Sequence, residues 1–443
     1  MPRQHWSGLK SGYTQGLRRV LLIFAIAFEL GAAVSPEFAQ RREKLRKEAP
    51  DGIVVLFGAK ESEDLHYGFF QESNFLYLTG WEEPGAILIL TPEPDKDDPN
   101  AIEKARIPRE ILFLPSRVPS QEKWTGRKLG PLDSNAADVT GFPTVMAAEQ
   151  FETRLRSFLD IYPGIYALPG AATTILNQLA PLRAVLDAAA PLATLRMEKS
   201  ESEISAIQHA TDASIDAHRA AWRMLKPGEY EYEIASAMAG TYMMEGCRRS
   251  AYAPIVGSGP NSTVLHYSKN SRRMDAGEIV VMDVAGECGN YASDITRTVP
   301  VSGHFTARQR EIYEVVLGAQ RAAIAAVKPG MTIGRKTPNS LYKIAFDYID
   351  SHGKDLHGQP LGKYFVHGLS HHVGLDVHDA SDTKEPLKAG MVITVEPGIY
   401  IPEENIGIRI EDVVLVTEKG ARVMSAALPV DPDEIERALA QRK

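Results

Sequence analysis

The second half of the chain places carboxylates inside strand-like segments whose other residues are apolar, where a buried core normally excludes unpaired charge. The first two such segments are 279–284 and 291–296, and they contain Asp283 and Asp294. If the hairpin is symmetric about a four-residue turn at 287–290, the two aspartates lie directly opposite each other, with Cβ atoms about 5 Å apart. Like charges at that separation destabilise a sheet unless something positive lies between them.

A second pair of segments repeats the arrangement. Segments 392–396 and 408–411 are joined through a turn at 403–404, and symmetric pairing places Glu396 opposite Glu411. Solvated edge hairpins are the alternative, and a bulge would shift either register. The apolar neighbours on both sides of each carboxylate favour buried strands instead. Four buried carboxylates in two pairs therefore predict a site for divalent metal ions.

Histidines are concentrated just before the second hairpin. Six of the twelve lie between His352 and His378, and the densest run is 367–372. An imidazole completes a carboxylate site for Mn, Co, Fe or Zn, and a carboxylate-rich site favours Mn. Four carboxylates and one imidazole suffice for two ions about 3.5 Å apart, which make hydroxide available near neutral pH. The spacing does not choose among the histidines of the run.

The two parts of the chain differ in organisation. Residues 41–195 mix three short apolar segments of strand length with helix-like stretches. A polar stretch then precedes a long helical pattern, so we place a domain boundary there and a second domain at 196–443. Within it, two helical runs end at Lys-Pro-Gly, at 226–228 and 328–330, and each is followed by a strand pair. This indicates an internal repeat.

The first 35 residues have the order of a secretory signal. An arginine pair at 18–19 precedes an apolar run at 20–28, and small residues predominate at 31–35. A buried N-terminal helix is the alternative, and Glu29 counts in its favour. We expect a signal peptide at 1–35 and an exported protein, periplasmic or secreted, or a cytoplasmic one if the signal is not cleaved. No later run approaches the roughly 18 apolar residues that span a bilayer, so we expect no membrane span in the mature chain.

The net charge limits the classes of partner, and the cysteine content limits the disulfides that the chain can form. The chain has 49 Lys and Arg against 57 Asp and Glu, a formal net charge of -8. We expect no nucleic-acid partner, because that affinity depends on neutralising phosphates. Cys247 and Cys288 could pair in an exported protein, but two residues give no disulfide framework. We expect two separate buried thiols.

These residues resemble the Xaa-Pro aminopeptidase (aminopeptidase P) and prolidase branch of the pita-bread metallopeptidases. The resemblance covers nearly all of the chain after the signal. It implies an α/β (α+β) fold class, with a small α/β N-terminal domain followed by a pseudo-symmetric pita-bread catalytic domain. The matching segments are GSGPN at 257–261, LHY at 265–267, MD at 282–283, SDITRT at 293–298, HGLSH at 367–371, GLDVHD at 374–379, TVEPGIY at 394–400 and GIRIED at 407–412.

The resemblance also implies roles for individual residues. His367 would donate a hydrogen bond to the developing oxyanion, and Glu396 would carry a proton from the nucleophilic water to the leaving nitrogen. His378 would be a third catalytic residue. The implied metal ligands are Asp283, Asp294, His371, Glu396 and Glu411.

Five residues are implied to contact or support the substrate: His266, His378, Tyr400, Asp64 and Arg409. His266 and His378 would line the proline side of the pocket. Arg409 would brace the carboxylates from behind, and Asp64 would bind the substrate α-ammonium or, equally, cap a helix or turn. His372 stands where the family usually has an aromatic or apolar residue, so it could be mistaken for the ligand beside it or be a simple packing residue.

The implied function is a dinuclear-metal aminopeptidase that hydrolyses the bond between an N-terminal residue and a following proline. Its cofactor would be two divalent ions, with Mn favoured and Co, Zn or Fe possible. Its partners would be peptides with proline in second position, and we expect a homo-oligomer. An Xaa-Pro dipeptidase (prolidase) is the alternative, and a non-catalytic pita-bread binding protein is a third. The intact ligand set argues against the third, because carboxylate pairs are costly without metal.

Overall fold

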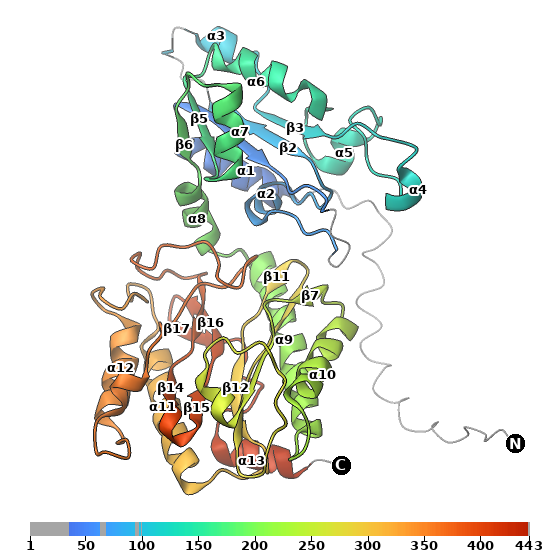
Figure 1. Cartoon of the computed structure of the whole chain (residues 1–443). Coiled ribbons are helices and arrows are strands. Elements are labelled where there is room, and N and C mark those ends of the chain that lie inside the picture. Colours follow the sequence, from blue (N-terminus) through green and yellow to red (C-terminus); the bar gives the residue numbers. More distant parts are fainter. Residues whose placement is uncertain (1–34, 63–67, 94–96, 99, 442–443) are drawn as a thin grey trace, which may run out of the picture. The chain divides into compact units, whose positions relative to one another are not determined.

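The computed structural model describes residues 35–62, 68–93, 97–98 and 100–441. The chain divides into two compact units, residues 1–188 and 189–443 (Figure 1). The division falls at the start of helix α8 (Ala189–Met197). Asp64 and all of the expected signal except Ser35 lie outside the described residues.

The first unit is built on a six-stranded mixed sheet in the order β4-β3-β2-β1-β5-β6. The three predicted strand segments form β1, β2 and β3, and Ile53 and Val55 of β1 pack against helices α6 and α7 in one apolar cluster. Strand β2 runs antiparallel to both of its neighbours, whereas β5 and β6 run parallel to β1. The strands are β1 (Gly52–Phe57), β2 (Ile87–Leu90), β3 (Glu110–Leu114), β4 (Val145–Ala147), β5 (Gly164–Ala167) and β6 (Val185–Asp187). The helices are α1 (Pro36–Glu48), α2 (Ser73–Thr79), α3 (Ala101–Lys104), α4 (Glu122–Thr125), α5 (Ala136–Thr140), α6 (Phe151–Leu159) and α7 (Ala171–Leu179).

The second unit shows the predicted repeat in its helices. Helices α9 (Glu201–Met224) and α11 (Ala307–Ala326) both end just before a Lys-Pro-Gly sequence, and Gly228 and Gly330 both take positive φ. Proline cannot continue the helical hydrogen bonding and glycine accepts the left-handed turn, so both helices stop there. Each long helix packs against the next one, α10 (Glu231–Met244) and α12 (Leu341–Ser351) respectively. A last helix, α13 (Pro432–Ala440), follows the strands.

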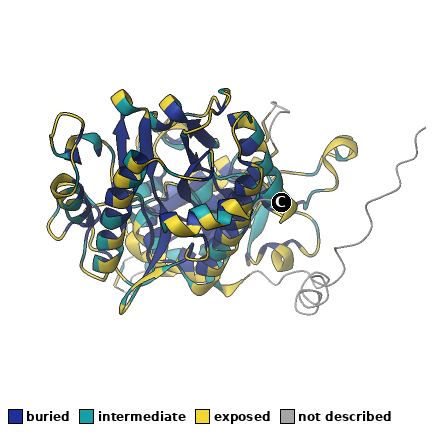
Figure 2. Ribbon diagram, turned by 90° about the horizontal axis from the view of Figure 1, so that it is seen from below, coloured by how far each residue is buried: buried dark blue, intermediate teal, exposed yellow. Residues whose placement is uncertain are grey.

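The strands of the second unit form small antiparallel sheets whose residues are mostly buried, and Figure 2 shows strands in dark blue between helices with yellow outer turns. One sheet contains β8 (Ile255–Ser258), β9 (Ile279–Asp283) and β12 (Thr296–Pro300), and another contains β13 (Val392–Val395), β16 (Asp412–Thr417) and β17 (Gly420–Val423). Strands β14 (Gly398–Ile401) and β15 (Ile406–Arg409) pair with each other, and β10 (Gly286–Cys288) lies between β7 (Arg249–Ser250) and β11 (Tyr291–Ala292).

Across the described residues, no helix is both long enough and apolar enough to cross a bilayer.

The predicted register of the first carboxylate hairpin is wrong by two residues. Asp283 pairs with Thr296 rather than with Asp294. The cause is the turn, which has two residues instead of four: Gly289 and Asn290 both take positive φ, 58° and 68°. Positive φ at both positions is the geometry of the tight turn that matches the twist of a hairpin. Because the shift is even, the two aspartates still belong to one face of the hairpin.

The predicted register of the second hairpin is confirmed. Val395 pairs with Asp412, and beyond the break in the strands Gly398 pairs with Arg409. Both ladders share one register, and this register sets Glu396 opposite Glu411 in the gap between them. The second pair of carboxylates therefore lies across the hairpin as the sequence predicts.

The expectation of two separate thiols is wrong, because Cys247 and Cys288 form a disulfide. Cys247 follows α10 and Cys288 ends β10, and the pairing of β7 with β10 brings the two segments together. The backbone N–H of Arg248 donates to the carbonyl of Glu287 at 3.1 Å, beside the bond. The disulfide closes a loop of 41 residues in sequence.

We predict that opening this disulfide lowers the free energy of unfolding by about 2–4 kcal/mol, because a closed loop of this length restricts the unfolded chain. Urea unfolding of the oxidised protein, the reduced protein and the Cys247→Ala/Cys288→Ala variant measures the difference. Identical denaturation midpoints for the oxidised and reduced forms would contradict the prediction.

Candidate metal centre and active site

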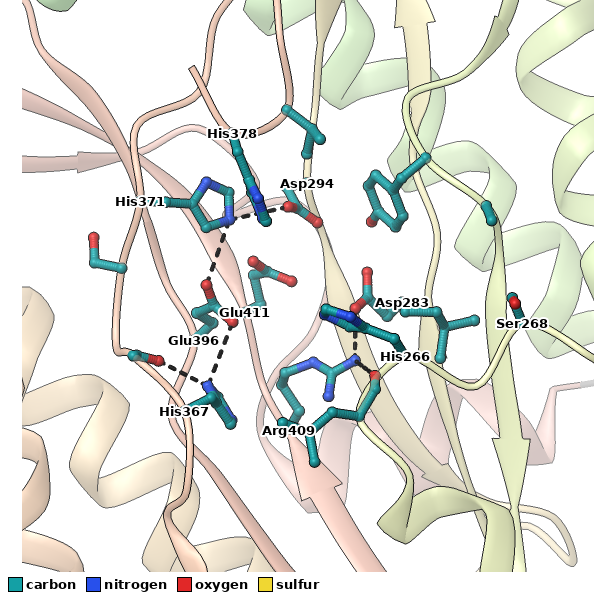
Figure 3. A pocket seen from close by; sticks show the side chains of 17 residues that line it. His266, Ser268, Asp283, Asp294, His367, His371, His378, Glu396, Arg409 and Glu411 are labelled. Carbon is teal, nitrogen blue, oxygen red and sulfur yellow. Dashed lines mark hydrogen bonds and ion pairs between the residues drawn. The ribbon is translucent and has the colours of Figure 1, made fainter. Parts of the chain in front are cut away.

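A cavity of about 510 Å³ in the second unit gathers the residues that the sequence singled out. Figure 3 shows their side chains converging from segments far apart in the chain. Tyr400 lies just behind the lining and contacts His367. The lining includes all five implied metal ligands, Asp283, Asp294, His371, Glu396 and Glu411, and also His266, His367, His378 and Arg409.

Strand alternation turns the carboxylates toward this cavity. In β9, Val280 and Met282 pack in the main apolar cluster, so Asp283 points to the opposite face. In β13, Ile393 and Val395 pack in the same cluster, and this leaves Glu396 on the cavity side. The same reasoning applies to Glu411, which follows the core residue Ile410. Asp294 lies between β11 and β12, so each carboxylate is found at a strand end or a break between strands.

The centre is compact enough to hold metal ions. Asp294, His371 and Glu411 each offer a ligand atom, and these atoms all lie within 4.8 Å of one another. His371 Nε2 is 3.3 Å from Asp294 Oδ2 and 3.4 Å from Glu396 Oε1. Glu411 is 2% exposed, and its Oε2 accepts a hydrogen bond from the hydroxyl of Thr296 at 2.6 Å.

Burial and mutual repulsion perturb these groups strongly. Burial, followed by the charges of Asp294 and Glu396, raises the pKa of Glu411 well above its usual range. Burial also raises the pKa of Glu396 to about 7, although His371 acts in the opposite direction. Burial lowers the pKa of His371, but its hydrogen bond to Asp294 and the charge of Glu396 outweigh it and raise the pKa to about 9. The raised pKa values of Glu396 and Glu411 mean that these carboxylates tend to bind protons. Closely spaced carboxylates do so unless a cation lies between them.

Unpartnered atoms in the centre fit a metal site. Asp283 Oδ1 and Asp294 Oδ1 are buried and have no hydrogen-bond partner among the residues that the structure describes. Buried carboxylate oxygens are normally satisfied, and oxygen and imidazole donors in this combination suit Mn, Fe, Co or Zn. The residues therefore fit divalent metal ions.

Arg409 links the carboxylates to His367 through Tyr400. The Arg409 guanidinium donates to Asp283 Oδ2 at 2.5 Å and to the Tyr400 hydroxyl at 2.7 Å. The Tyr400 hydroxyl lies 2.9 Å from His367 Nε2, and His367 Nδ1 lies 2.7 Å from the carbonyl of Gly368. Arg409 is 4% exposed, so this is a largely buried chain of hydrogen bonds.

The surroundings of His367 determine whether its ring is charged and which of its nitrogens carries the proton. Burial and the nearby Arg409 lower the pKa of His367 to about 4, so its ring is neutral at neutral pH. A neutral ring donates from one nitrogen only: Nδ1 to Gly368, while Nε2 accepts from Tyr400. His367 must exchange one of these partners before it can donate to a substrate carbonyl.

The two adjacent histidines face different surroundings. His371 reaches the carboxylates, and its ring packs against that of His378 with centroids 4.2 Å apart. His372 is 2% exposed and pairs with Ile393 across an isolated bridge, on the opposite side of the strand-like segment. Burial and the charge of Lys199 lower the pKa of His372 to about 3, which is typical of a neutral packing residue.

Tyr252 lines the cavity beside the carboxylates, and no pattern in the sequence predicted it. Its hydroxyl is buried. Burial, followed by the charges of Asp283 and Asp294, raises the pKa of Tyr252 well above its usual range. Tyr252 lies in a short irregular segment before β8, and no periodicity or spacing there distinguishes it from a surface tyrosine.

Comparison with known proteins identifies the family. Residues 205–418 match the model of metallopeptidase family M24, and residues 38–166 match the model of the aminopeptidase P N-terminal domain. The chain is 34% identical to the Xaa-Pro aminopeptidase of Haemophilus influenzae, over 91% of this chain and 97% of that protein. The chain belongs to metallopeptidase family M24, in its aminopeptidase P branch.

Solved structures of this aminopeptidase P branch share the fold. Aminopeptidase P from Escherichia coli with the inhibitor Pro-Leu superposes with a TM-score of 0.79 at 31% identity, and covers 91% of this chain and 98% of that one. The zinc-substituted Escherichia coli enzyme in complex with product gives 0.80 at 30% identity, over 92% and 98% of the two chains. The predicted fold, a small α/β domain followed by a pita-bread domain, is confirmed.

We predict that His371→Ala loses bound metal and that turnover falls at least about 100-fold, since a lost ligand costs several kcal/mol of transition-state stabilisation. His372→Ala should keep its metal, with its main cost in stability, because the side chain packs away from the carboxylates. Metal content and turnover of the two variants measured side by side test the assignment. The reverse pattern would move the ligand to His372.

Proposed function

We propose that this protein is a metal-dependent Xaa-Pro aminopeptidase, which releases the first residue of a peptide whose second residue is proline. One observation carries the proposal: four carboxylates and His371 converge in a cavity whose rim carries His266 and His378, in a member of the aminopeptidase P branch. A peptide bond before proline has no N–H, and the ring fixes the backbone behind it. A dedicated pocket must therefore recognise the ring itself.

The protein's own groups take separate parts in this reaction. Asp283, Asp294, His371, Glu396 and Glu411 would hold two divalent metal ions, which when bound would supply a nucleophilic hydroxide near neutral pH. Glu396 carries a proton from the attacking water to the leaving nitrogen of proline. His367 leaves one of its two protein partners and donates to the substrate carbonyl oxygen.

The remaining residues bind and orient the substrate. His266 and His378 line the proline side, and His378 also packs on His371 and so limits its rotation. Arg409 holds Asp283 and Tyr400 in place. The resemblance to the family assigns binding of the substrate α-ammonium to Asp64, and this role stays a prediction.

We propose Mn as the native metal, because oxygen donors predominate in the ligand set and hard ligands favour it. The expected result of thorough chelation is loss of activity, with recovery on adding Mn or Co. Turnover and metal content measured before and after chelation, and after each addition, test the requirement. Full activity in metal-free protein would overturn it.

We further propose that the protein is exported and acts as a homo-oligomer. The signal-like order of residues 1–35 and the disulfide between Cys247 and Cys288 support export, since disulfides persist in oxidising compartments. N-terminal sequencing of the mature chain from fractionated cells tests export, and sedimentation tests the assembly. An intact N-terminus in the cytoplasmic fraction would contradict export.

The substrate assignment predicts cleavage of Xaa-Pro peptides of three or more residues. Replacing the proline by alanine or blocking the N-terminus should lower kcat/KM at least about 100-fold, because the ring and the α-ammonium lose their partners. Asp64→Ala should mainly weaken discrimination against blocked N-termini. Mass spectrometry of products from matched peptides measures all three effects. Cleavage confined to dipeptides would instead indicate a prolidase, and equal cleavage of Xaa-Ala peptides would remove the proline specificity.

A further inference from the structure

A buried carboxylate outside the metal centre lies behind the wall of the cavity that carries His266. Glu231 begins helix α10 and is 0% exposed. Its carboxylate accepts hydrogen bonds from residues 258–272, here called the His266 loop. This loop supplies Leu265, His266 and Ser268 to the lining of the cavity.

Both oxygens of Glu231 are used. Oε1 accepts from the backbone N–H and the hydroxyl of Ser258, both at 2.8 Å, and from the side-chain amide of Asn261 at 3.0 Å. Oε2 accepts from the Tyr267 hydroxyl and from the backbone N–H of Arg272, both at 2.8 Å. One carboxylate therefore joins the start, the middle and the end of the loop.

This carboxylate holds the loop together with the side chain of Asn270, which donates to the Pro254 carbonyl at 2.8 Å and accepts from the backbone N–H of Val256 at 2.9 Å. Residues 264–272 form neither helix nor strand, and their backbone is joined to α10 where the N–H of Glu231 donates to the carbonyl of Arg272 at 3.0 Å. The guanidinium of Arg272 donates to both oxygens of Glu278 at 2.6 Å, whereas the hydrogen bonds that Glu231 accepts come from other groups of the loop. Hydrogen bonds to an ionised acceptor are the stronger kind, and removing a buried acceptor leaves its donors unsatisfied.

The opposite side of the loop contacts the strand that supports the metal centre. The backbone N–H of Gly407 donates to the Ser262 hydroxyl at 2.8 Å, and Arg409 donates to the carbonyl of Leu265 at 3.4 Å. A Cβ atom at position 407 would lie 1.9 Å from the Ser262 carbonyl oxygen, so only glycine permits this approach. The loop is held between Glu231 and β15.

We propose that Glu231 is a positioning residue for proline recognition, which acts by ordering the His266 loop and so placing His266 against the residue after the scissile bond. The inference rests on the proposed place of His266 at the proline side. Proline offers no N–H to bind. Its recognition therefore depends on the position of the pocket residues that contact its ring. Glu231 has no hydrogen bond to a metal ligand, so its loss should affect selectivity and leave metal binding intact.

The test is Glu231→Gln in the full-length, metal-loaded protein. The amide keeps one acceptor oxygen and turns an NH₂ group toward donors. The preference for Xaa-Pro over Xaa-Ala peptides should fall at least about tenfold, mainly through KM, as expected from losing two or more charged hydrogen bonds. Metal content should stay unchanged, and hydrogen exchange at residues 258–272 should speed up.

Matched variants separate this role from general destabilisation. Glu203→Gln alters another buried carboxylate near a helix N-terminus, which accepts from Ser200 and from Tyr291 at 3.0 Å, and it should leave the proline preference unchanged. Tyr267→Phe removes one of the five donors and keeps the fold testable if Glu231→Gln does not fold. Tyr267→Phe should also lower the preference for Xaa-Pro over Xaa-Ala peptides through KM, by a smaller factor than Glu231→Gln.

The outcomes distinguish this inference from the proposed function. A folded, metal-loaded Glu231→Gln protein with a proline preference and KM within about twofold of the unaltered enzyme would overturn the inference, as would an unchanged Tyr267→Phe protein when Glu231→Gln does not fold. If His266→Ala itself retains the full preference, the proposed role of His266 fails instead. Slow exchange of the loop in Glu231→Gln would exclude the ordering role whatever His266 does.

Discussion

The catalytic unit is organised around the repulsion among four buried carboxylates. Their burial and proximity raise the pKa of Glu396 and Glu411, so the protein alone does not neutralise the group. Arg409 and His371 supply part of the positive charge, at Asp283 and Asp294 respectively. The negative charge that remains on the carboxylates favours the binding of divalent cations. The strand registers, the chain from Arg409 to His367 and the burial of the site all serve to hold these like charges together.

The two carboxylate hairpins are held together by contacts that leave the ligand oxygens facing the cavity. Thr296 donates to Glu411, and its carbonyl accepts the backbone N–H of Glu411 at 3.1 Å. Arg297, fully buried, donates to the Glu411 carbonyl at 2.6 Å and to Asp412 at 2.7 Å. A planar guanidinium with several fixed donors suits this bridging position better than a lysine would. Polar groups next to the ligands in sequence thus join the hairpins.

Sequence patterns predicted the parts of the site that depend on period-2 alternation and on symmetric turns. They placed Glu396 and Glu411 correctly but misjudged the first register, because the residues around Gly289-Asn290 permit either a four-residue or a two-residue turn. Spacing could not choose between His371 and His372, since neighbouring residues differ only in which face they occupy, and the resemblance to a family made that choice. Tyr252 and the disulfide were out of reach, because the packing of α10 and β7 against β10 brings distant segments together. In the sequence, Glu231 is one acidic residue at the start of a helix. Only the structure shows that its carboxylate accepts five hydrogen bonds.

The internal repeat divides the ligands between its two copies. Asp283 and Asp294 come from the first strand group, whereas Glu396 and Glu411 come from the second, and between them lie the helices α11 and α12. Carboxylates from both copies line the same cavity, so a cation that used all of them would need both copies folded and docked. The free energy of binding divalent cations there would therefore also stabilise the association between the two copies.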